Sequence, residues 1–241
     1  MLGTEAELAG VQVYLRCRVG TCRREGDHWC VDAWRSRILV DASGKNGLRV
    51  DGKADRETDD ELLAIALSIS YSHHRGPDLR TCIEATSSGW WYTAPLTRGI
   101  AITMFLTDPA LYCEEGISIH EQLKNAPVTM RRLEGGHIHD SHVPHVTSSC
   151  RRAVFGDGWL AVGDSACSFD PISGRGIFSA LRHAGSATAA ITACLNGNMD
   201  PAVLYASQVR LEYDEYVRVR RLYYLSERRW SEHPFWLARC R

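Results

Sequence analysis

The stretch from Trp159 to Gly176 reads WLAVGDSACSFDPISGRG and predicts the core of the fold. Its apolar start predicts a strand that ends at Gly163-Asp164. A short loop with Asp170-Pro171 follows, and a helix rich in small residues begins at about Gly176. In α/β proteins this order of strand, acidic residue, tight loop and helix N-terminus holds a ligand at the carboxyl end of a parallel strand. The stretch therefore predicts an α/β fold with a ligand site at this loop.

The residue types at this loop indicate what the ligand would look like. Asp164 at the strand end can accept hydrogen bonds from ligand hydroxyls. Gly174 and Gly176 let backbone N–H groups come close to a ligand, and the helix dipole behind them favours negative charge. A flavin, with hydroxyls at one end and an electron-rich ring at the other, fits this description. The alternative is an ordinary strand–loop–helix connection in which the Asp caps its own loop.

Three other segments, in the right chain order, carry a family resemblance. They are Ile38–Gly44 (ILVDASG), Glu84–Pro95 with its Gly-Trp-Trp-Tyr, and Tyr223–Trp236 at the C-terminal end. Together with the stretch above, they resemble FAD-dependent monooxygenases of the p-hydroxybenzoate hydroxylase type. The resemblance is greatest to the flavin-dependent tryptophan halogenase-like group, which includes flavoproteins that mature quinone cofactors.

The resemblance implies FAD as the cofactor and assigns it a set of contacts. Asp164 is expected at the ribityl or pyrophosphate end, Pro171 beside the isoalloxazine ring, and the Gly174 and Gly176 amides at its pyrimidine edge. Such amides would stabilise an anionic flavin. No side chain qualifies as an acid–base catalyst, so the catalytic residues are unknown. The expected cofactor-binding residues are Gly163, Asp164, Pro171, Gly174, Gly176, Asp41 and Gly44.

A run of aromatic residues suggests where a substrate would lie. On a strand, Trp90 and Tyr92 share one face and Trp91 takes the other. Trp90 and Tyr92 are therefore candidate substrate contacts. Packing in the core and between domains is the competing interpretation, and it is the commoner use of aromatic residues.

The run His137, His139, His142 and His145 is the best competing site. Imidazole suits zinc, copper or iron. However, the preceding Gly135-Gly136 and Pro144 within the run favour a loop or an edge strand. We therefore predict a histidine-rich surface loop and no metal site. His183, on the helix after Gly176, is expected to be a satisfied helix histidine.

Composition limits the classes of function. The chain has 241 residues, with 28 Lys and Arg against 29 Asp and Glu, a formal net charge of −1. This balance gives no support for a nucleic-acid or membrane-surface partner. Arginines near the C-terminus, Arg218 to Arg229, are expected on a solvated, ion-paired face. The nine cysteines form no Cys-x-x-Cys pair, which favours reduced thiols in a cytoplasmic protein.

The pattern along the chain predicts a mixed α/β, or α+β, protein. Residues 1–52 and 150–200 are expected to form a Rossmann-like FAD-binding domain, with a β-sheet substrate domain over 53–149 and helices over 201–241. A helix is expected at the N-terminus, then a meander whose first strand is Val11–Val19, then a polar connector over Lys45–Glu61. The strand before Gly163 should run parallel to Ile38–Asp41, and the strands of Leu62–Asp108 should form a separate sheet.

One departure from the family pattern concerns the N-terminus. Family members begin with a strand and a Gly-x-Gly-x-x-Gly turn that binds the ADP pyrophosphate, and the chain has no such motif. We therefore expect an N-terminally truncated form that lacks the first βαβ unit. Residues 1–241 alone are then expected to retain FAD weakly or not at all.

The expected function is that of an FAD-dependent oxidoreductase or monooxygenase acting on a small aromatic or peptidyl substrate through reduced flavin and oxygen. NAD(P)H or a flavin reductase would supply the electrons. The first alternative is a non-catalytic fragment, or a metal-binding module that uses the run from His137 to His145. The second is a halogenase relative, which the sequence disfavours because it lacks the Lys and the Trp-x-Trp-x-Ile-Pro element of that branch.

Overall fold

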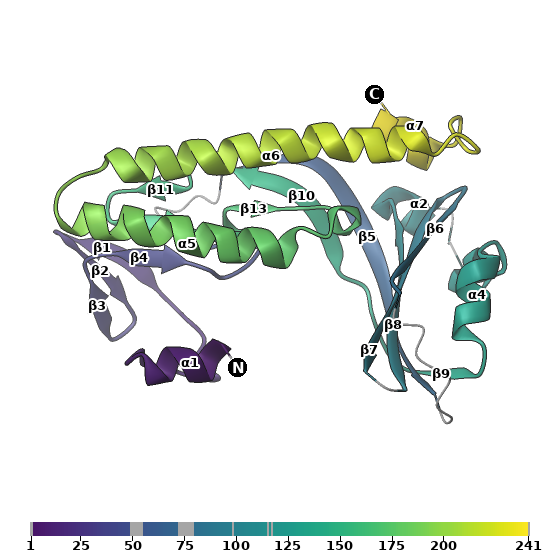
Figure 1. Cartoon of the computed structure of the whole chain (residues 1–241), viewed down its shortest axis with the longest axis horizontal. Coiled ribbons are helices and arrows are strands. Elements are labelled where there is room, and N and C mark those ends of the chain that lie inside the picture. Colours follow the sequence, from purple (N-terminus) through teal and green to yellow (C-terminus); the bar gives the residue numbers. More distant parts are fainter. Residues whose placement is uncertain are drawn as a thin grey trace.

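The computed structural model describes residues 2–48, 55–71, 80–97, 99–114, 116 and 118–240. It shows a mixed α/β fold, as the sequence predicts. One half holds a pair of long helices and two small sheets, and the other half holds a large antiparallel sheet with short helices (Figure 1). A single long helix spans both halves and connects them.

A small antiparallel sheet lies near the N-terminus. Helix α1 (Leu2–Leu8) is present as predicted, and strands β1 (Cys22–Glu25), β2 (His28–Val31) and β3 (Trp34–Ser36) pair in that order. The prediction of a strand over Val11–Val19 is wrong. Apolar side chains from that segment are exposed, so no described element offers the face that such a strand would need to bury.

The parallel pairing predicted around the ligand loop is confirmed. Strand β12 (Trp159–Ala161) runs parallel to β4 (Leu39–Asp41), with Ala161 opposite Asp41, and β11 (Phe155–Gly156) completes the sheet on the other side of β12. Because both parallel strands end at the same edge, the turns that follow them are brought together there.

The large sheet has seven antiparallel strands, and the strands within Leu62–Asp108 belong to it, separate from β4 and β12 as predicted. Its order is β13-β10-β5-β8-β7-β6, and β9 also pairs with β5. The strands are β5 (Arg56–Tyr71), β6 (Cys82–Thr86), β7 (Gly89–Thr97), β8 (Ile100–Thr107), β9 (Gly136–His142), β10 (His145–Arg151) and β13 (Cys167–Ser168). Strand β13 lies inside the ligand loop, so this sheet reaches the predicted site. The division into three domains stays a prediction.

Strand β5 begins earlier than the sequence predicts. The polar stretch Lys45–Glu61 was expected to form a connector, but Arg56 to Glu61 continue β5 and pair with β10; residues 49–54 lie outside the described part. Their polar side chains find partners on other elements, as when Arg56 Nε donates to Ser149 Oγ at 2.9 Å. Partners that are remote in sequence thus turn a polar segment into a strand.

Cys150 and Cys167 lie opposite each other in β10 and β13 and are joined by a disulfide. Both are buried. The expectation of reduced thiols is wrong for this pair, because the strand register brings together two cysteines that no sequence motif associates.

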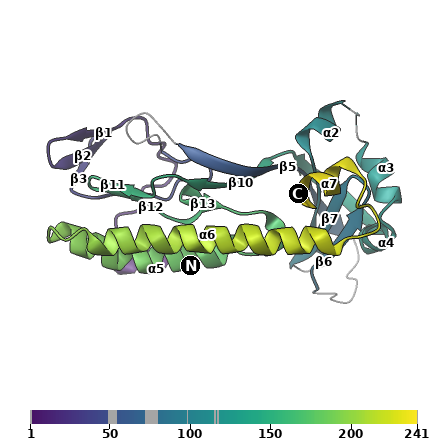
Figure 2. The same cartoon turned by 90° about the horizontal axis from the view of Figure 1, so that it is seen from above.

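The helices around the ligand loop agree well with the sequence pattern. Helix α5 spans Gly176–Leu195, and Gly197 after it has a φ of +81°, a left-handed conformation that favours glycine after a helix. Helix α6 spans Asp200–Ser226 with Pro201 in its first turn, and α7 spans Pro234–Cys240. Figures 1 and 2 show α5 and α6 side by side, and α6 continuing on to the large sheet, where α7 packs.

Three short helices, α2 (Pro109–Glu114), α3 (Ile119–Lys124) and α4 (Pro127–Leu133), accompany the large sheet. Residues from all three pack around buried Trp91 and Phe105, on the sheet face opposite Trp90. In the part of the chain that the structure describes, no helix is both long and apolar enough to cross a bilayer.

Candidate functional site

A 3-10 turn over Gly163–Ser165 follows β12 and forms the centre of the site. Gly163 has a φ of +58°, and a Cβ added to it would lie 3.2 Å from the Cβ of Ala180 on α5. The backbone conformation and the close approach of α5 therefore both require glycine. The Gly163 N–H also donates to His183 Nδ1 at 3.2 Å, which fixes the turn against α5.

Asp164, the second residue of this turn, is solvent-exposed. Its carboxylate makes no hydrogen bond or ion pair within the described residues, while its backbone carbonyl accepts from Arg56 Nη2 at 3.2 Å. The protein atoms packed around it raise its pKa, and the positive charges of Arg56 and Lys45 act in the opposite direction. Arg56 thus fixes the backbone of Asp164, and the Asp164 carboxylate remains available to a ligand.

The loop before α5 presents open backbone. Gly174 has a φ of +60°, and a Cβ added to Gly174 or to Gly176 would meet no atom within 4 Å. Upstream, the Asp170 carboxylate accepts the Ile172 N–H at 2.9 Å and so caps the short turn that begins at Pro171. The free amides at the N-terminus of the 20-residue helix α5 therefore lie where a ligand can approach them.

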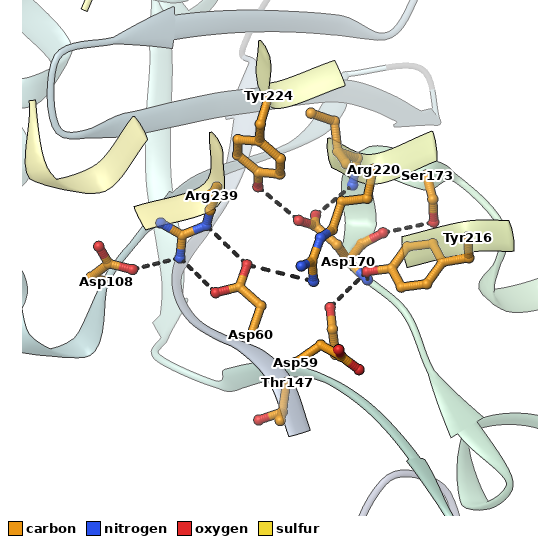
Figure 3. Close-up of polar contacts among 12 residues, drawn as sticks. Asp59, Asp60, Asp108, Thr147, Asp170, Ser173, Tyr216, Arg220, Tyr224 and Arg239 are labelled. Carbon is orange, nitrogen blue, oxygen red and sulfur yellow. Dashed lines mark hydrogen bonds and ion pairs between the residues drawn. The ribbon is translucent and has the colours of Figure 1, made fainter. Parts of the chain in front are cut away.

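Helix α6 holds Asp170 from the buried side. The Asp170 N–H donates to Tyr216 Oη at 2.8 Å, and Tyr224 Oη donates to Asp170 Oδ2 at 2.7 Å. Ser173 Oγ donates to the Asp170 carbonyl at 2.7 Å, so the loop also closes on itself (Figure 3). Asp170 is fully buried, and this burial raises the pKa of its carboxyl group.

An ionic cluster lies next to these contacts. Arg239 of α7 donates through Nε to Asp60 Oδ2 at 2.9 Å and through Nη2 to Asp108, and Arg220 Nη1 is 3.8 Å from the same Asp60 oxygen (Figure 3). The Arg239 side chain is only 2% exposed. The cluster connects α7 and α6 to the start of β5 and to the end of β8.

His183 connects the Gly163 turn to α6. Its Nε2 lies 3.5 Å from Glu212 Oε2, and Ser179 Oγ donates to the other Glu212 oxygen at 2.6 Å. His183 and Glu212 are both buried. Burial lowers the pKa of His183, and Glu212 acts against this shift. The prediction that His183 is a satisfied helix residue is confirmed for Nδ1, which accepts the Gly163 N–H.

Asp41 and Gly44 are brought next to the Gly163 turn, as the strand pairing requires. The Asp41 carboxylate is buried and accepts from Ser43, from Leu48 N–H at 2.7 Å and from Arg151 Nη1 at 3.0 Å. Although burial acts to raise its pKa, these bonds lower it. The carboxylate therefore organises its own turn, which leaves the backbone near Gly44, at a φ of +83° with open space around it, as the part that faces outward.

The candidate substrate residues lie on one face of β7, as predicted. Trp90 is fully buried, and its indole N–H donates to Tyr224 Oη at 3.1 Å. Tyr92 is half-buried and packs against the same apolar cluster, as does Ile172 of the ligand loop. The structure thus brings β7 and the loop together, and it gives Trp90 a place in the core while Tyr92 keeps some exposed surface.

The four histidines of the competing site do not gather. His137, His139 and His142 lie on strand β9, which pairs with β5, and His145 begins β10; all four are exposed. Across the described residues, no group of three or more His, Cys, Asp or Glu side chains is arranged to hold a metal ion.

Sequence reasoning missed several residues that support the site. Arg56 binds the carbonyls of Asp164 and Ser165, although its segment was predicted to be a connector. Arg220 is buried, so the expectation of a solvated arginine face is wrong there, whereas Arg218 is exposed and paired with Glu215 as expected. The available signal was the spacing of three or eight residues between the tyrosines of α6, which places Tyr205, Tyr213, Tyr216 and Tyr224 on one face of the helix.

Comparison with known proteins shows which family and which solved structures the chain is similar to. The family model described as Tryptophan halogenase matches residues 4–241. A putative FAD-dependent oxidoreductase, LodB, from Marinomonas mediterranea is 29% identical over 220 residues, which is 83% of this chain and 55% of the relative.

Two solved structures share the fold. The flavin-dependent halogenase CmlS superposes with a TM-score of 0.85 at 20% identity, covering 98% of this chain and 47% of CmlS. The peptidyl tryptophan dihydroxylase QhpG, described as essential for tryptophylquinone cofactor biogenesis, gives a TM-score of 0.79 at 23% identity, covering 99% of this chain and 57% of QhpG. The chain thus spans about half the length of these relatives.

Proposed function

The chain belongs to the tryptophan halogenase family, and on this premise we propose that it forms the ribityl and ring side of an FAD site in a flavin-dependent oxidoreductase. The observation that supports FAD most directly is the pairing of an unused carboxylate with open backbone. Asp164 has no partner among the described side chains, and Gly174 and Gly176 leave room in front of the α5 amides. A hydroxylated chain that ends in an electron-rich ring satisfies both groups.

Under this proposal each residue has a specific task. Asp164 accepts hydrogen bonds from the ribityl hydroxyls, and the amides around Gly174 and Gly176 donate to the pyrimidine edge, where negative charge develops on reduction. Pro171 lies beside the ring. Reduced FAD supplies the oxygen-activating chemistry, and the protein supplies position and polarity. Electrons come from NAD(P)H, directly or through a flavin reductase.

We propose an aromatic substrate, either a small molecule or a peptidyl side chain. The support is the proximity of half-buried Tyr92 to the loop residue Ile172 across a shared apolar cluster. The fold likeness to a peptidyl tryptophan dihydroxylase points to the same class of substrate.

Oxygenation is favoured over halogenation by the composition of β7. Trp90, Tyr92, Ala94 and Pro95 occupy the spacing of the Trp-x-Trp-x-Ile-Pro element, but Tyr and Ala replace its second Trp and its Ile. Halogenation stays the second candidate because a brominase from Pseudoalteromonas luteoviolacea is 26% identical over 190 residues. Product mass separates the two, since hydroxylation adds oxygen and halogenation adds chlorine or bromine.

Titration of the 241-residue chain with FAD tests the cofactor site. We expect weak but saturable quenching of flavin fluorescence, because the proposed site would hold only the ribityl and ring part of FAD and the sequence has no Gly-x-Gly-x-x-Gly motif for the pyrophosphate. Asp164→Ala should weaken this binding about 10- to 100-fold, because losing a charge-assisted hydrogen bond costs about 1.5–3 kcal/mol. Asp140→Ala, which removes an exposed carboxylate from the edge strand β9, is the control and should bind as the wild type does.

The variant Gly176→Val distinguishes an effect on folding from an effect on FAD binding. A Cβ added at Gly176 meets no atom of the neighbouring elements within 4 Å, so the melting temperature should hold while FAD affinity falls. Gly185→Val, at another open position on α5, should change neither. The proposal fails if millimolar FAD gives no saturable binding, or if Asp164→Ala and Gly176→Val both bind as tightly as the wild type.

A further inference from the structure

Three buried side chains form a continuous hydrogen-bond chain from the large sheet to the ligand loop. The Trp90 indole N–H on β7 donates to Tyr224 Oη at 3.1 Å, and Tyr224 Oη donates to Asp170 Oδ2 at 2.7 Å. A tyrosine hydroxyl can accept and donate at once, so Tyr224 serves both partners. Figure 3 shows Tyr224 and Asp170 facing each other beneath the loop.

Because these groups are buried, the two hydrogen bonds are costly to break. Trp90, Tyr224 and Asp170 are each 0% exposed. If the Trp90–Tyr224 bond opens, the indole N–H is left buried without a partner. If the Tyr224–Asp170 bond opens, the phenol O–H loses its acceptor and the carboxylate loses a donor, at about 1–3 kcal/mol for each group. Burial also raises the pKa of Tyr224 well above its usual value, so its hydroxyl keeps the proton that it donates. A displacement of Asp170 is therefore opposed by the bonds to Tyr224 and Trp90, and a displacement of Trp90 by the bonds to Tyr224 and Asp170.

At its loop end the hydrogen-bond chain fixes the turn that would face the ligand. The second Asp170 oxygen accepts the Ile172 N–H at 2.9 Å, and Tyr216 accepts the Asp170 N–H. Pro171 lies between Asp170 and Ile172, so its position is set by the two contacts of one carboxylate. The charged groups near this carboxylate are Arg220 and Asp60, with opposite effects.

We propose that Trp90, Tyr224 and Asp170 form a positioning relay that transmits ligand binding at the Pro171–Gly174 loop to strand β7, where an aromatic substrate would bind. This inference rests on the proposed FAD site. It assigns Tyr224 a role that packing alone does not require: to couple the order of the substrate strand to occupancy of the loop.

Hydrogen exchange of the full chain, with and without saturating FAD, tests the relay. In the wild type FAD should slow exchange at residues 170–175 and also in β7, the latter about fivefold or more, which is the lower end of coupling between linked sites. Tyr224→Phe should keep the protection of the loop and lose that of β7. Trp90→Phe cuts the chain at its other end and should do the same, so the test does not depend on one variant folding.

Tyr213→Phe is the matched control. Tyr213 is also a buried tyrosine of α6, and its hydroxyl donates to a carboxylate, Asp59, at 2.7 Å rather than to a residue of the loop. Its ring packs against Phe169 and is kept in the variant, so only the hydroxyl is removed. It should keep protection at both places. The relay is overturned if β7 is not protected in the wild type, or if its protection persists in Tyr224→Phe and Trp90→Phe. Absence of protection at residues 170–175 in every protein would overturn the FAD site and the relay together.

Discussion

His183 shows how one side chain can depend on pH through its hydrogen bonds. Its Nδ1 must be unprotonated to accept the Gly163 N–H, and Nε2 then carries the proton and faces Glu212. Other groups around the ring are Arg182 and Asp164, whose charges act in opposite directions, and Tyr205, which meets the ring edge-on. Burial is the largest influence and lowers the pKa of His183 below its usual 6.5.

A histidine whose pKa is depressed in the folded state makes the folded protein less stable as pH falls. Below about pH 6.5 the unfolded chain takes up a proton that the folded chain refuses, so the free energy of unfolding decreases until the folded pKa is reached. Above that window the contribution is constant. We expect the melting temperature of the wild type to fall between pH 7 and pH 5.5 by more than that of His183→Gln, which can still accept the Gly163 N–H.

His139→Gln, at an exposed position of β9, is the control and should keep the wild-type slope. Thermal melting monitored by circular dichroism across this pH range is sufficient. Equal slopes in the wild type and in His183→Gln would mean that the imidazole does not titrate in this way.

At the scale of the element, β9 carries three of the four histidines along one exposed strand. Residues along a strand alternate between faces, and the register shift in the pairing with β5 falls at His139, between Ile138 opposite Ile69 and Asp140 opposite Ser68. The imidazoles therefore spread along an exposed strand.

We expect removal of divalent metal to leave the stability of the chain unchanged. A structural metal contributes directly to folding, so its chelation would lower the melting temperature by several degrees. Thermal melting before and after dialysis against EDTA gives the answer, with zinc added back as the companion sample. A lower melting temperature that zinc restores would indicate a metal site.

Helix α6 is the element that the apolar pattern describes least well. Its buried face consists largely of polar residues that find specific partners: Tyr205 with the Ala161 carbonyl, Glu212 with Ser179, and Tyr213, Tyr216 and Tyr224 with the contacts described above. A scan for apolar residues at helical spacing undervalues such a face. The four buried tyrosines are nevertheless three or eight residues apart, which places them on one face of the helix.

At the scale of the whole molecule, the Arg239 cluster attaches α7 to the large sheet. Arg239 pairs with Asp60 and Asp108 and also donates to the Phe235 carbonyl at 2.8 Å. Removing one partner of a buried ion pair is strongly destabilising because the other charge stays buried without compensation.

We therefore expect Arg239→Met to lower the free energy of unfolding by about 3–5 kcal/mol, measured by urea denaturation. Adding Asp108→Asn should recover part of this loss, because it removes a carboxylate that pairs with Arg239, whereas Asp60 also faces Arg220. Arg218→Met is the control, since Arg218 is 62% exposed and exposed ion pairs contribute about 0–1 kcal/mol. A change of less than 1 kcal/mol in Arg239→Met would show that the cluster is not a point of attachment.

Local patterns in the sequence were sufficient for the centre of the molecule. The apolar residues before Gly163, the glycines around Arg175 and the small residues of α5 predicted the strand, turn and helix that the structure contains. The parallel pairing with Leu39–Asp41 followed from the same pattern together with the family resemblance. The strand, the turn and the helix depend on neighbours within about one turn or one strand, so the sequence alone determines them, whereas the parallel pairing joins segments far apart in the chain.

Tertiary structure decided everything that depends on partners distant in the chain. Arg56 became part of a strand because β10 pairs with it, Val11–Val19 stayed irregular because no face covers it, and Cys150 met Cys167 through strand register. Likewise, the bond from Tyr224 to Asp170 joins residues 54 positions apart. Hydrogen bonds and ion pairs are short-ranged, so only the folded arrangement determines which polar side chains can form them.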